Sequence, residues 1–176
     1  MSVQNIIAYP DPVLRCQSEP VTEFGDPLQH LIENLTETLY STPGIGLCAP
    51  QLGRSTRVVV MDLSAGQSEL ELYINPVIVK KAGLAIAEEA CLSIPGVTAK
   101  VMRSSHIQIQ AQRSDGEGFE KELTGMQAIC LQHEIDHLNG ILFFDRISLI
   151  RRLRFRRALQ ALEADMAQQP VSAAST

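Results

Sequence analysis

Apolar residues in the first part of the chain recur at helical spacing. Asp26-Pro27 is typical of a helix N-cap followed by proline, and Pro43-Gly44 is a strong break. We therefore predict a helix between these points, with one apolar face. Asp11-Pro12 predicts a similar N-cap near the start of the chain. The apolar face consists of Leu28, Leu31, Ile32, Leu35 and Leu39.

The middle of the chain carries the patterns of strands. Residues 57–63 are apolar and rich in β-branched side chains, and residues 70–74 form a second run that Asn75-Pro76 stops. Residues 106–112 alternate between polar and apolar, as in a strand with one face in solvent. Asp115-Gly116 supplies a turn into a further strand, so we predict a hairpin.

A second helix is predicted from an N-cap at Thr124 to about Asn139, with Gly140 as its C-terminal stop. Apolar residues lie on nearly every side of it, which is typical of a helix inside a protein. These residues are Met126, Ile129, Cys130, Leu131, Ile135 and Leu138.

A last helix is predicted to begin near Ser148. The length of 176 residues suits one domain, so we predict a single catalytic domain over residues 1–165 that includes this helix, followed by a disordered tail over 166–176. No apolar run is long enough for a membrane span, and the N-terminus lacks the features of a signal peptide. We therefore expect a cytoplasmic protein. Four irregularly spaced cysteines are then expected to be reduced thiols: Cys16, Cys48, Cys91 and Cys130.

The formal net charge of −5 conceals an asymmetry. Residues 1–145 carry 9 Lys/Arg and 18 Asp/Glu, a balance of −9, whereas residues 146–176 carry 6 Arg and 2 acids, a balance of +4. A basic end on an acidic body is typical of a segment that contacts an anionic partner.

His133 and His137 lie four residues apart in the second predicted helix, within Gln-His-Glu-Ile-Asp-His. Residues at this spacing share one helix face, so both imidazoles can reach one metal ion. Glu134 can then take a proton from water at the metal and return it to the leaving group. Burying two histidines with Glu134 and Asp136 would be costly unless something satisfied them. The pattern predicts a hydrolytic metal site, and a chance match on a solvated helix is the alternative.

A catalytic metal site needs a third protein ligand. One large peptidase group has a third histidine downstream, but Phe143 stands at that position. Another group uses a downstream glutamate, and only Glu163 is available, near the end of the Arg-rich helix. Upstream, Cys91 could complete a Cys/His/His set, or it could be a small buried apolar residue. Spacing alone leaves this choice open.

Three separated motifs resemble those of the peptide deformylases. They are Gly-Ile-Gly-Leu-Cys-Ala-Pro-Gln at 44–51, Glu-Ala-Cys-Leu-Ser at 89–93 and Gln-His-Glu-Ile-Asp-His at 132–137. Their order and spacing match as well, and the similarity runs from about residue 3 to about residue 165. Each motif alone is weak evidence, whereas the three together are specific.

The resemblance implies an α+β fold in which antiparallel sheets surround a central buried helix carrying the His-Glu-x-x-His motif, with a further helix at the C-terminus. It implies Cys91, His133 and His137 as metal ligands, with Fe(II) as the typical ion and Zn, Ni or Co as alternatives. The implied substrate is the N-formyl-methionyl end of newly made polypeptides, from which hydrolysis releases formate.

The resemblance also implies where the reacting amide is held. The side-chain amide of Gln51 and the backbone N–H of Leu92 would donate to the developing oxyanion. Gly44 and Gly46 permit close backbone approach, so their segment could hold a peptide as an added strand.

A pocket for the methionine side chain follows from helix geometry and the resemblance together. Met126, Ile129 and Cys130 share the helix face of His133, where they could line an apolar slot. The family places Ile45 opposite them. Ordinary core packing is the alternative for each of the four.

Two positions depart from the family pattern. Ala90 stands where the second motif usually has glycine, so its methyl group could restrict the backbone or crowd a substrate. Cys48 replaces the usual alanine. A specialised second copy beside a housekeeping enzyme would explain such departures. Two other hypotheses are a thermolysin-like or metzincin-like peptidase, and a non-catalytic ribosome-binding relative.

The C-terminal helix is strongly basic between residues 151 and 157 and has no acid in that stretch. A solvated helix face is one explanation. Because some deformylases dock on the ribosome through a basic C-terminal helix, ribosomal RNA is the partner that the resemblance implies, through salt-sensitive phosphate contacts. The arginines are Arg151, Arg152, Arg154, Arg156 and Arg157.

Overall fold

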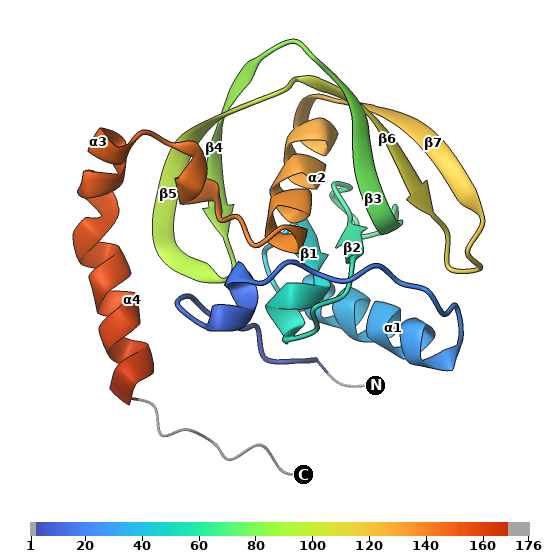
Figure 1. Cartoon of the computed structure of the whole chain (residues 1–176), viewed down its shortest axis with the longest axis horizontal. Helices are drawn as coiled ribbons and strands as arrows, with labels where there is room; N and C mark the ends of the chain where they lie inside the picture. The colour runs from blue at the N-terminus through green and yellow to red at the C-terminus, as the bar shows by residue number, and fades with distance from the viewer. Residues whose placement is uncertain (1–2, 169–176) are drawn as a thin grey trace.

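The computed structural model describes residues 3–168 and has an α+β architecture with two antiparallel sheets (Figure 1). This confirms the predicted class. The larger sheet has the strand order β1 (Gly46–Cys48), β2 (Val58–Met61), β3 (Glu71–Ala82), β6 (His106–Gln112) and β7 (Gly118–Thr124). The smaller sheet pairs β4 (Ala85–Cys91) with β5 (Ile94–Arg103). The α-helices are α1 (Asp26–Tyr40), α2 (Gly125–Leu138), α3 (Leu149–Arg152) and α4 (Arg156–Gln168).

Helix α1 covers one face of the larger sheet. Of the five residues predicted on its apolar face, Leu28, Ile32, Leu35 and Leu39 are buried, and Leu31 is partly buried against the same cluster. Its N-cap is Gly25, one residue before the predicted Asp26, and no side chain caps it. The Asp11 prediction is confirmed, because its carboxylate accepts a hydrogen bond from the Val13 N–H at the start of a 3-10 helix over Pro12–Arg15.

Helix α2 lies between the β4–β5 pair and the strands β3, β6 and β7 (Figure 1). All its residues from 128 to 138 are buried. The two helices pack on opposite faces of the larger sheet, as strand β2 shows. Its residues Val59 and Met61 pack towards α2, whereas Val58 and Val60 pack towards α1. Gly140 follows the helix with φ +70°, the left-handed conformation expected after a helix C-terminus.

Strand β3 does not stop at Asn75-Pro76, so that prediction was wrong. Asn75 takes a positive φ of 52°, and the pairing with β6 shifts register between Ile74 and Val77. The Asn75 side chain donates to the Val21 carbonyl at 2.9 Å and to Gln112 Oε1 at 2.7 Å. A β-bulge that the Asn75 side chain stabilises thus allows the strand to continue through Asn-Pro, a pair that normally ends a strand.

The predicted hairpin of β6 and β7 is confirmed, with His106 opposite Thr124 and Gln112 opposite Gly118. The hairpin of β4 and β5 was not predicted. Strand β5 alternates buried and exposed residues up to Arg103, whose buried side chain points inwards like those of Val97 and Val101.

The C-terminal segment runs along the outer side of β5 (Figure 1). Leu159 of α4 is buried against the cluster that contains Val97 and Phe143, and Tyr9 Oη donates to Glu163 Oε1 at 2.7 Å. Helix α4 includes residues 166–168, which we had predicted as the start of a disordered tail. Residues 169–176 of that predicted tail lie outside the described residues. Within residues 3–168, no helix combines the length and apolarity needed to cross a membrane.

Candidate metal centre

Three ligand-type side chains converge where the end of β4 meets α2. Cys91 is the last residue of β4, at a register shift against β5, while His133 and His137 occupy successive turns of α2. Their candidate ligand atoms all lie within 4.8 Å of one another. Cys91 Sγ is 3.1 Å from His137 Nε2. The structure therefore brings together the three residues that the resemblance implied.

A buried carboxylate fixes the orientation of the first imidazole. Glu89 Oε2 lies 2.9 Å from His133 Nδ1, which leaves Nε2 of that ring free to bind a metal. Glu89 also accepts hydrogen bonds from Arg103 Nε at 2.7 Å and from another Arg103 nitrogen at 2.9 Å. Burial alone would raise the pKa of Glu89, but the Arg103 and His133 hydrogen bonds outweigh it and hold the pKa at about 2. The carboxylate is therefore ionised at neutral pH.

The same arginine connects β4 to the second acid of α2. Arg103 pairs with Asp136, and Asp136 also accepts from Arg146 Nε at 2.9 Å. The two buried acids of α2 thus differ in their partners: Asp136 is neutralised by two guanidinium groups, whereas Glu134 borders the cavity beside His133.

Glu134 is placed to handle protons. Its side chain is buried, and its Oε2 atom has no hydrogen-bond partner in the described part of the chain. Burial raises the pKa of this carboxyl above its ordinary value. Strand β1 packs directly over it, because a Cβ added to Gly46 would lie 2.8 Å from Glu134 Oε1 and 2.8 Å from Cys130 Sγ. Only a glycine fits there without displacing one of these side chains.

Gln51 presents its amide nitrogen to the centre. Cys48 holds the opposite end, because its backbone N–H donates to Gln51 Oε1 at 3.0 Å and its thiol at 3.3 Å. The amide Nε2 is therefore left to point towards Ser93 Oγ at 3.2 Å and Cys91 Sγ at 3.7 Å. Burial raises the pKa of the Cys48 thiol well above its usual value, so this cysteine stays protonated and can donate.

A cavity of about 430 Å³ opens beside these residues. Ile129 and Cys130 form buried parts of its wall, whereas Ile45 and Met126 stand at its rim, 41% and 53% exposed. Leu92 lies in the turn after β4 and also faces the cavity. All predicted pocket residues thus border one cavity, together with Gly44, Gly46, Gln51, Cys91, His133 and Glu134.

The donor set suits a divalent transition metal. One thiolate and two imidazoles, with room for a fourth ligand in an adjoining cavity, match the pattern of catalytic rather than structural zinc-type sites. Two further observations agree with a metal at this site. His133 is oriented through its Nδ1 atom by Glu89, and His137 Nε2 faces Cys91.

Known proteins resemble this chain over most of its length. The family model described as Polypeptide deformylase matches residues 3–153. The chain belongs to the polypeptide deformylase family. It is 44% identical over 163 residues to a peptide deformylase of Chromobacterium violaceum, covering 93% of this chain and 98% of that one. A peptide deformylase of Hydrogenovibrio crunogenus is 44% identical over 169 residues, covering 96% and 98%. The crystal structure of a peptide deformylase from Legionella pneumophila superimposes with a TM-score of 0.87 at 39% identity, covering 96% of this chain and all of that one.

The departure from the family pattern at Ala90 does not strain the backbone. Among the described non-glycine residues only Gln67 and Asn75 have a positive φ, so Ala90 adopts a conformation open to any residue. Its exposed side chain borders the cavity, next to Cys91. Crowding of a bound substrate by the methyl group stays a prediction.

Sequence reasoning missed the supporting residues of this deformylase site. Glu89 and Ser93 lie inside the second motif, which by itself predicts no role for them. Arg103 lies outside all three motifs. The sequence does contain a pattern that indicates a buried Arg103. The alternation through Val97, Ala99 and Val101 places the next inward side chain at this arginine.

Proposed function

We propose that this protein hydrolyses the N-formyl group of N-formyl-methionyl polypeptides, giving formate and a free amino terminus. The observation that carries the proposal is the convergence of Cys91, His133 and His137, within 4.8 Å, beside the buried carboxylate of Glu134. Membership of the polypeptide deformylase family supports the same reaction.

We propose that Cys91, His133 and His137 hold one divalent metal ion, with Fe(II) as the resident ion and Zn, Ni or Co able to replace it. When bound, the ion supplies Lewis-acid activation of water and of the formyl oxygen. Helix α2, enclosed between the two sheets, holds both imidazoles in place. Glu89 then fixes which nitrogen of His133 faces the ion.

Glu134 acts as the proton carrier. Hydrolysis joins the water oxygen to the formyl carbon and breaks the bond between that carbon and the amide nitrogen. Glu134 accepts the proton that the water loses and donates it to the leaving nitrogen. Its place in the cavity wall, without a competing partner on Oε2, supports this role.

Gln51 and Leu92 stabilise the oxyanion that develops on the formyl oxygen. Gln51 contributes its side-chain amide, and Leu92 its backbone N–H. The two hydrogen bonds from Cys48 to Gln51 Oε1 preorganise that amide, because they fix which end faces Cys91. Preorganised donors need no rearrangement in the transition state.

Substrate binding uses the two walls of the cavity. The segment Gly44–Gly46 and the β4 residues 88–90 border it, so an extended peptide can lie between them as an added strand. Ile129 and Cys130 form the floor of the side-chain pocket, and Ile45 and Met126 form its rim. An unbranched methionine side chain suits this mainly apolar lining.

Formate release from formyl-Met-Ala-Ser by protein prepared anaerobically with Fe(II) tests the activity. We expect multiple turnovers with Fe(II). Absence of formate with Fe, Co, Ni and Zn alike would contradict the proposal. Formate with an intact free amine product separates deformylation from cleavage of the Met-Ala bond by a conventional peptidase.

We also propose that the protein works in the cytoplasm and docks on ribosomal RNA through its basic C-terminal segment. Arg151, Arg154, Arg156 and Arg157 are exposed and form no ion pair with the described residues. Arg152 differs, because it pairs with Asp145 at 3.3 Å. Unpaired arginines on one segment suit contacts with phosphates.

Removing the whole segment would be a poor test, because Leu159 is part of the core. A better test measures ribosome co-sedimentation of the double variant Arg154→Gln/Arg157→Gln. The control is Lys80→Gln/Lys100→Gln, which removes two exposed positive charges elsewhere on the protein. We expect the arginine pair alone to weaken binding, and most strongly at low salt, because added salt screens the phosphate contacts that these arginines make. Equal retention by both variants would refute RNA docking.

We propose that residues 1–165 form a single catalytic domain, so this docking segment belongs to it.

A further inference from the structure

Strand β4 has an open edge beside the metal centre. In the part of the chain that the structure describes, β4 pairs with β5 alone. Within the same residues, no backbone-to-backbone hydrogen bond outside that pairing involves residues 85–91. An unpaired strand edge is a template on which an extended chain can add as a further strand.

The cavity of the metal centre follows this edge. Its lining includes residues 88–92, from the middle of β4 to the turn after it. Strand β4 runs towards Cys91, so a peptide that follows the edge from a formyl group at the metal centre runs in the opposite direction to β4. This antiparallel arrangement is the one that β4 already has with β5.

The side chains of β4 alternate between two faces of the smaller sheet. Glu89 and Cys91 point inwards and are buried, whereas Ile86, Glu88 and Ala90 are exposed on the other face. In order from the metal centre, the exposed face therefore presents a small residue, a carboxylate and a large apolar residue. An added strand would place every second side chain beside this series.

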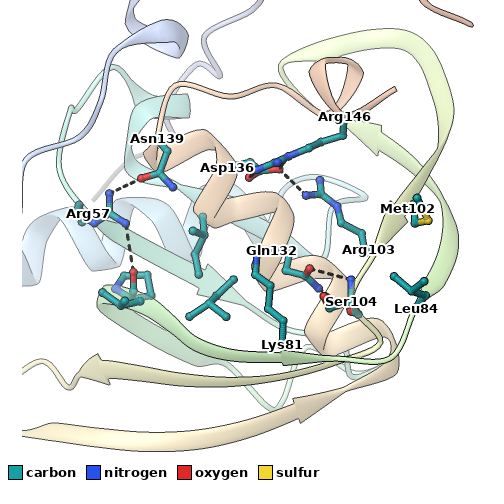
Figure 2. A pocket seen from close by; sticks show the side chains of 14 residues that line it. Arg57, Lys81, Leu84, Met102, Arg103, Ser104, Gln132, Asp136, Asn139 and Arg146 are labelled. Atoms are coloured by element: carbon teal, nitrogen blue, oxygen red, sulfur yellow. Dashed lines mark hydrogen bonds and ion pairs between the residues drawn. The ribbon is translucent and has the colours of Figure 1, made fainter. Parts of the chain in front are cut away.

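The end of this face that is furthest from the metal centre is apolar. Ile86 lies directly opposite Met102 of β5, and the two residues are 72% and 63% exposed. Leu84, just before β4, is 75% exposed. Figure 2 shows Leu84 and Met102 together at one end of a cavity that both residues line, at the opposite end from Arg57. Large apolar side chains that are exposed together are typical of an interaction surface.

A short peptide is long enough to reach this apolar surface from the metal centre. Ile86 stands five positions before Cys91 in β4, which corresponds to roughly 17 Å at about 3.4 Å per residue of an antiparallel strand. A paired peptide advances by the same step, so it reaches Ile86 with about its fifth or sixth residue. A tripeptide ends before that point.

We propose that Leu84, Ile86 and Met102 bind an apolar side chain at the fifth or sixth residue of the formylated polypeptide, while the residues before it pair with the open edge of β4. The inference rests on the proposed deformylation and extends its binding site beyond the formyl-methionine. Since all substrates of that reaction share the formyl-methionine, only residues further along can make the enzyme favour one polypeptide over another.

Formate release by the Fe(II) protein from three peptides tests this proposal. Formyl-Met-Ala-Ser ends before the apolar surface. Formyl-Met-Ala-Ser-Ala-Leu-Leu reaches it with leucines, and formyl-Met-Ala-Ser-Ala-Ser-Ser reaches it with serines. We expect kcat/KM for the leucine hexapeptide to exceed that for the serine hexapeptide roughly three- to tenfold, as for partial burial of one leucine side chain. The gain should appear mainly as a lower KM.

A matched pair of variants assigns this preference to β4. Ile86→Thr and Val79→Thr each replace an exposed β-branched apolar residue of a strand, but Val79 lies on β3 and outside the lining of the metal-centre cavity. We expect Ile86→Thr to bring the ratio of the two hexapeptides close to one, and Met102→Thr to lower it as well. Val79→Thr should keep the ratio of the wild type.

The peptides separate this inference from the reaction on which it rests. Equal kcat/KM for the two hexapeptides in the wild type, with formate released from the tripeptide, would refute the apolar site and leave the deformylation intact. An unchanged ratio in both Ile86→Thr and Met102→Thr, or an equal loss in Val79→Thr, would also refute it. Absence of formate from all three peptides would contradict the proposed function, and this inference with it.

Discussion

Glu89 and His133 form a hydrogen bond of 2.9 Å between Oε2 and Nδ1 that links the supporting residues to the metal ligands. Glu89 is in turn held by two hydrogen bonds from Arg103. The orientation of one ligand therefore depends on a residue at the far end of β5. Such outer contacts decide how well a ligand set binds its ion.

Glu89→Gln is expected to weaken metal binding roughly 10- to 100-fold, because an amide holds the imidazole less firmly than a carboxylate. Metal affinity can be measured by competition with a chromogenic chelator. Glu88→Gln is the control, since Glu88 is the exposed neighbour on the same strand. Equal metal affinity for the Glu89 variant and the wild type would show that this hydrogen bond does not support the site.

Arg103→Met is expected to lower the free energy of unfolding by on the order of 3–5 kcal/mol, because two buried carboxylates lose a shared partner. Urea denaturation of the metal-loaded proteins measures this. Arg113→Met provides the comparison, because the Arg113 side chain is 61% exposed. If both variants lose the same stability, the buried network contributes little.

The fold was largely predictable where one pattern acts alone. Helix α1 and the hairpin of β6 and β7 follow from periodicity and turn residues. Strand β3 was misjudged because Asn75-Pro76 breaks strands in general, and only the distant partners Val21 and Gln112 stabilise the bulge there. The β4–β5 hairpin lacks a strong apolar run, because one of its faces is exposed.

The site was predictable only in part. The histidines and Glu134 follow from helical spacing, because their separation is local. Cys91 lies more than forty residues upstream of His133, so only the resemblance could join them. Arg103 escaped notice because its meaning depends on which face of β5 turns inwards, and that is decided by pairing with β4.

Gly46→Ala is expected to reduce kcat/KM roughly 10- to 100-fold while the metal content is kept. The added Cβ would lie 2.8 Å from Glu134 Oε1, and displacement of a catalytic group by a fraction of an ångström to one ångström has effects of this size. Gly118→Ala should be silent, since nothing lies within 4 Å of its added Cβ. Unchanged kcat/KM in Gly46→Ala would mean that Glu134 does not need this packing.

Ala90→Gly is expected to raise kcat/KM on formyl-Met peptides a few-fold, through a lower KM. The backbone at Ala90 is not strained, so glycine would not raise activity by relieving strain. We expect the gain to come from extra space beside the bound peptide. Steady-state kinetics on formyl-Met-Ala-Ser measures both constants. An unchanged KM would show that the methyl group does not touch the substrate.

In the proposed mechanism, Cys91, His133 and His137 hold one metal ion while Glu134 moves the proton. Metal content and formate release, measured together on the same anaerobic Fe(II) preparations, test it most directly. We predict that Glu134→Gln keeps one ion per chain but loses roughly 10²- to 10⁴-fold in kcat, whereas Cys91→Ala loses the ion and the activity together. Full activity in Glu134→Gln, or a retained stoichiometric ion with full activity in Cys91→Ala, would contradict the account.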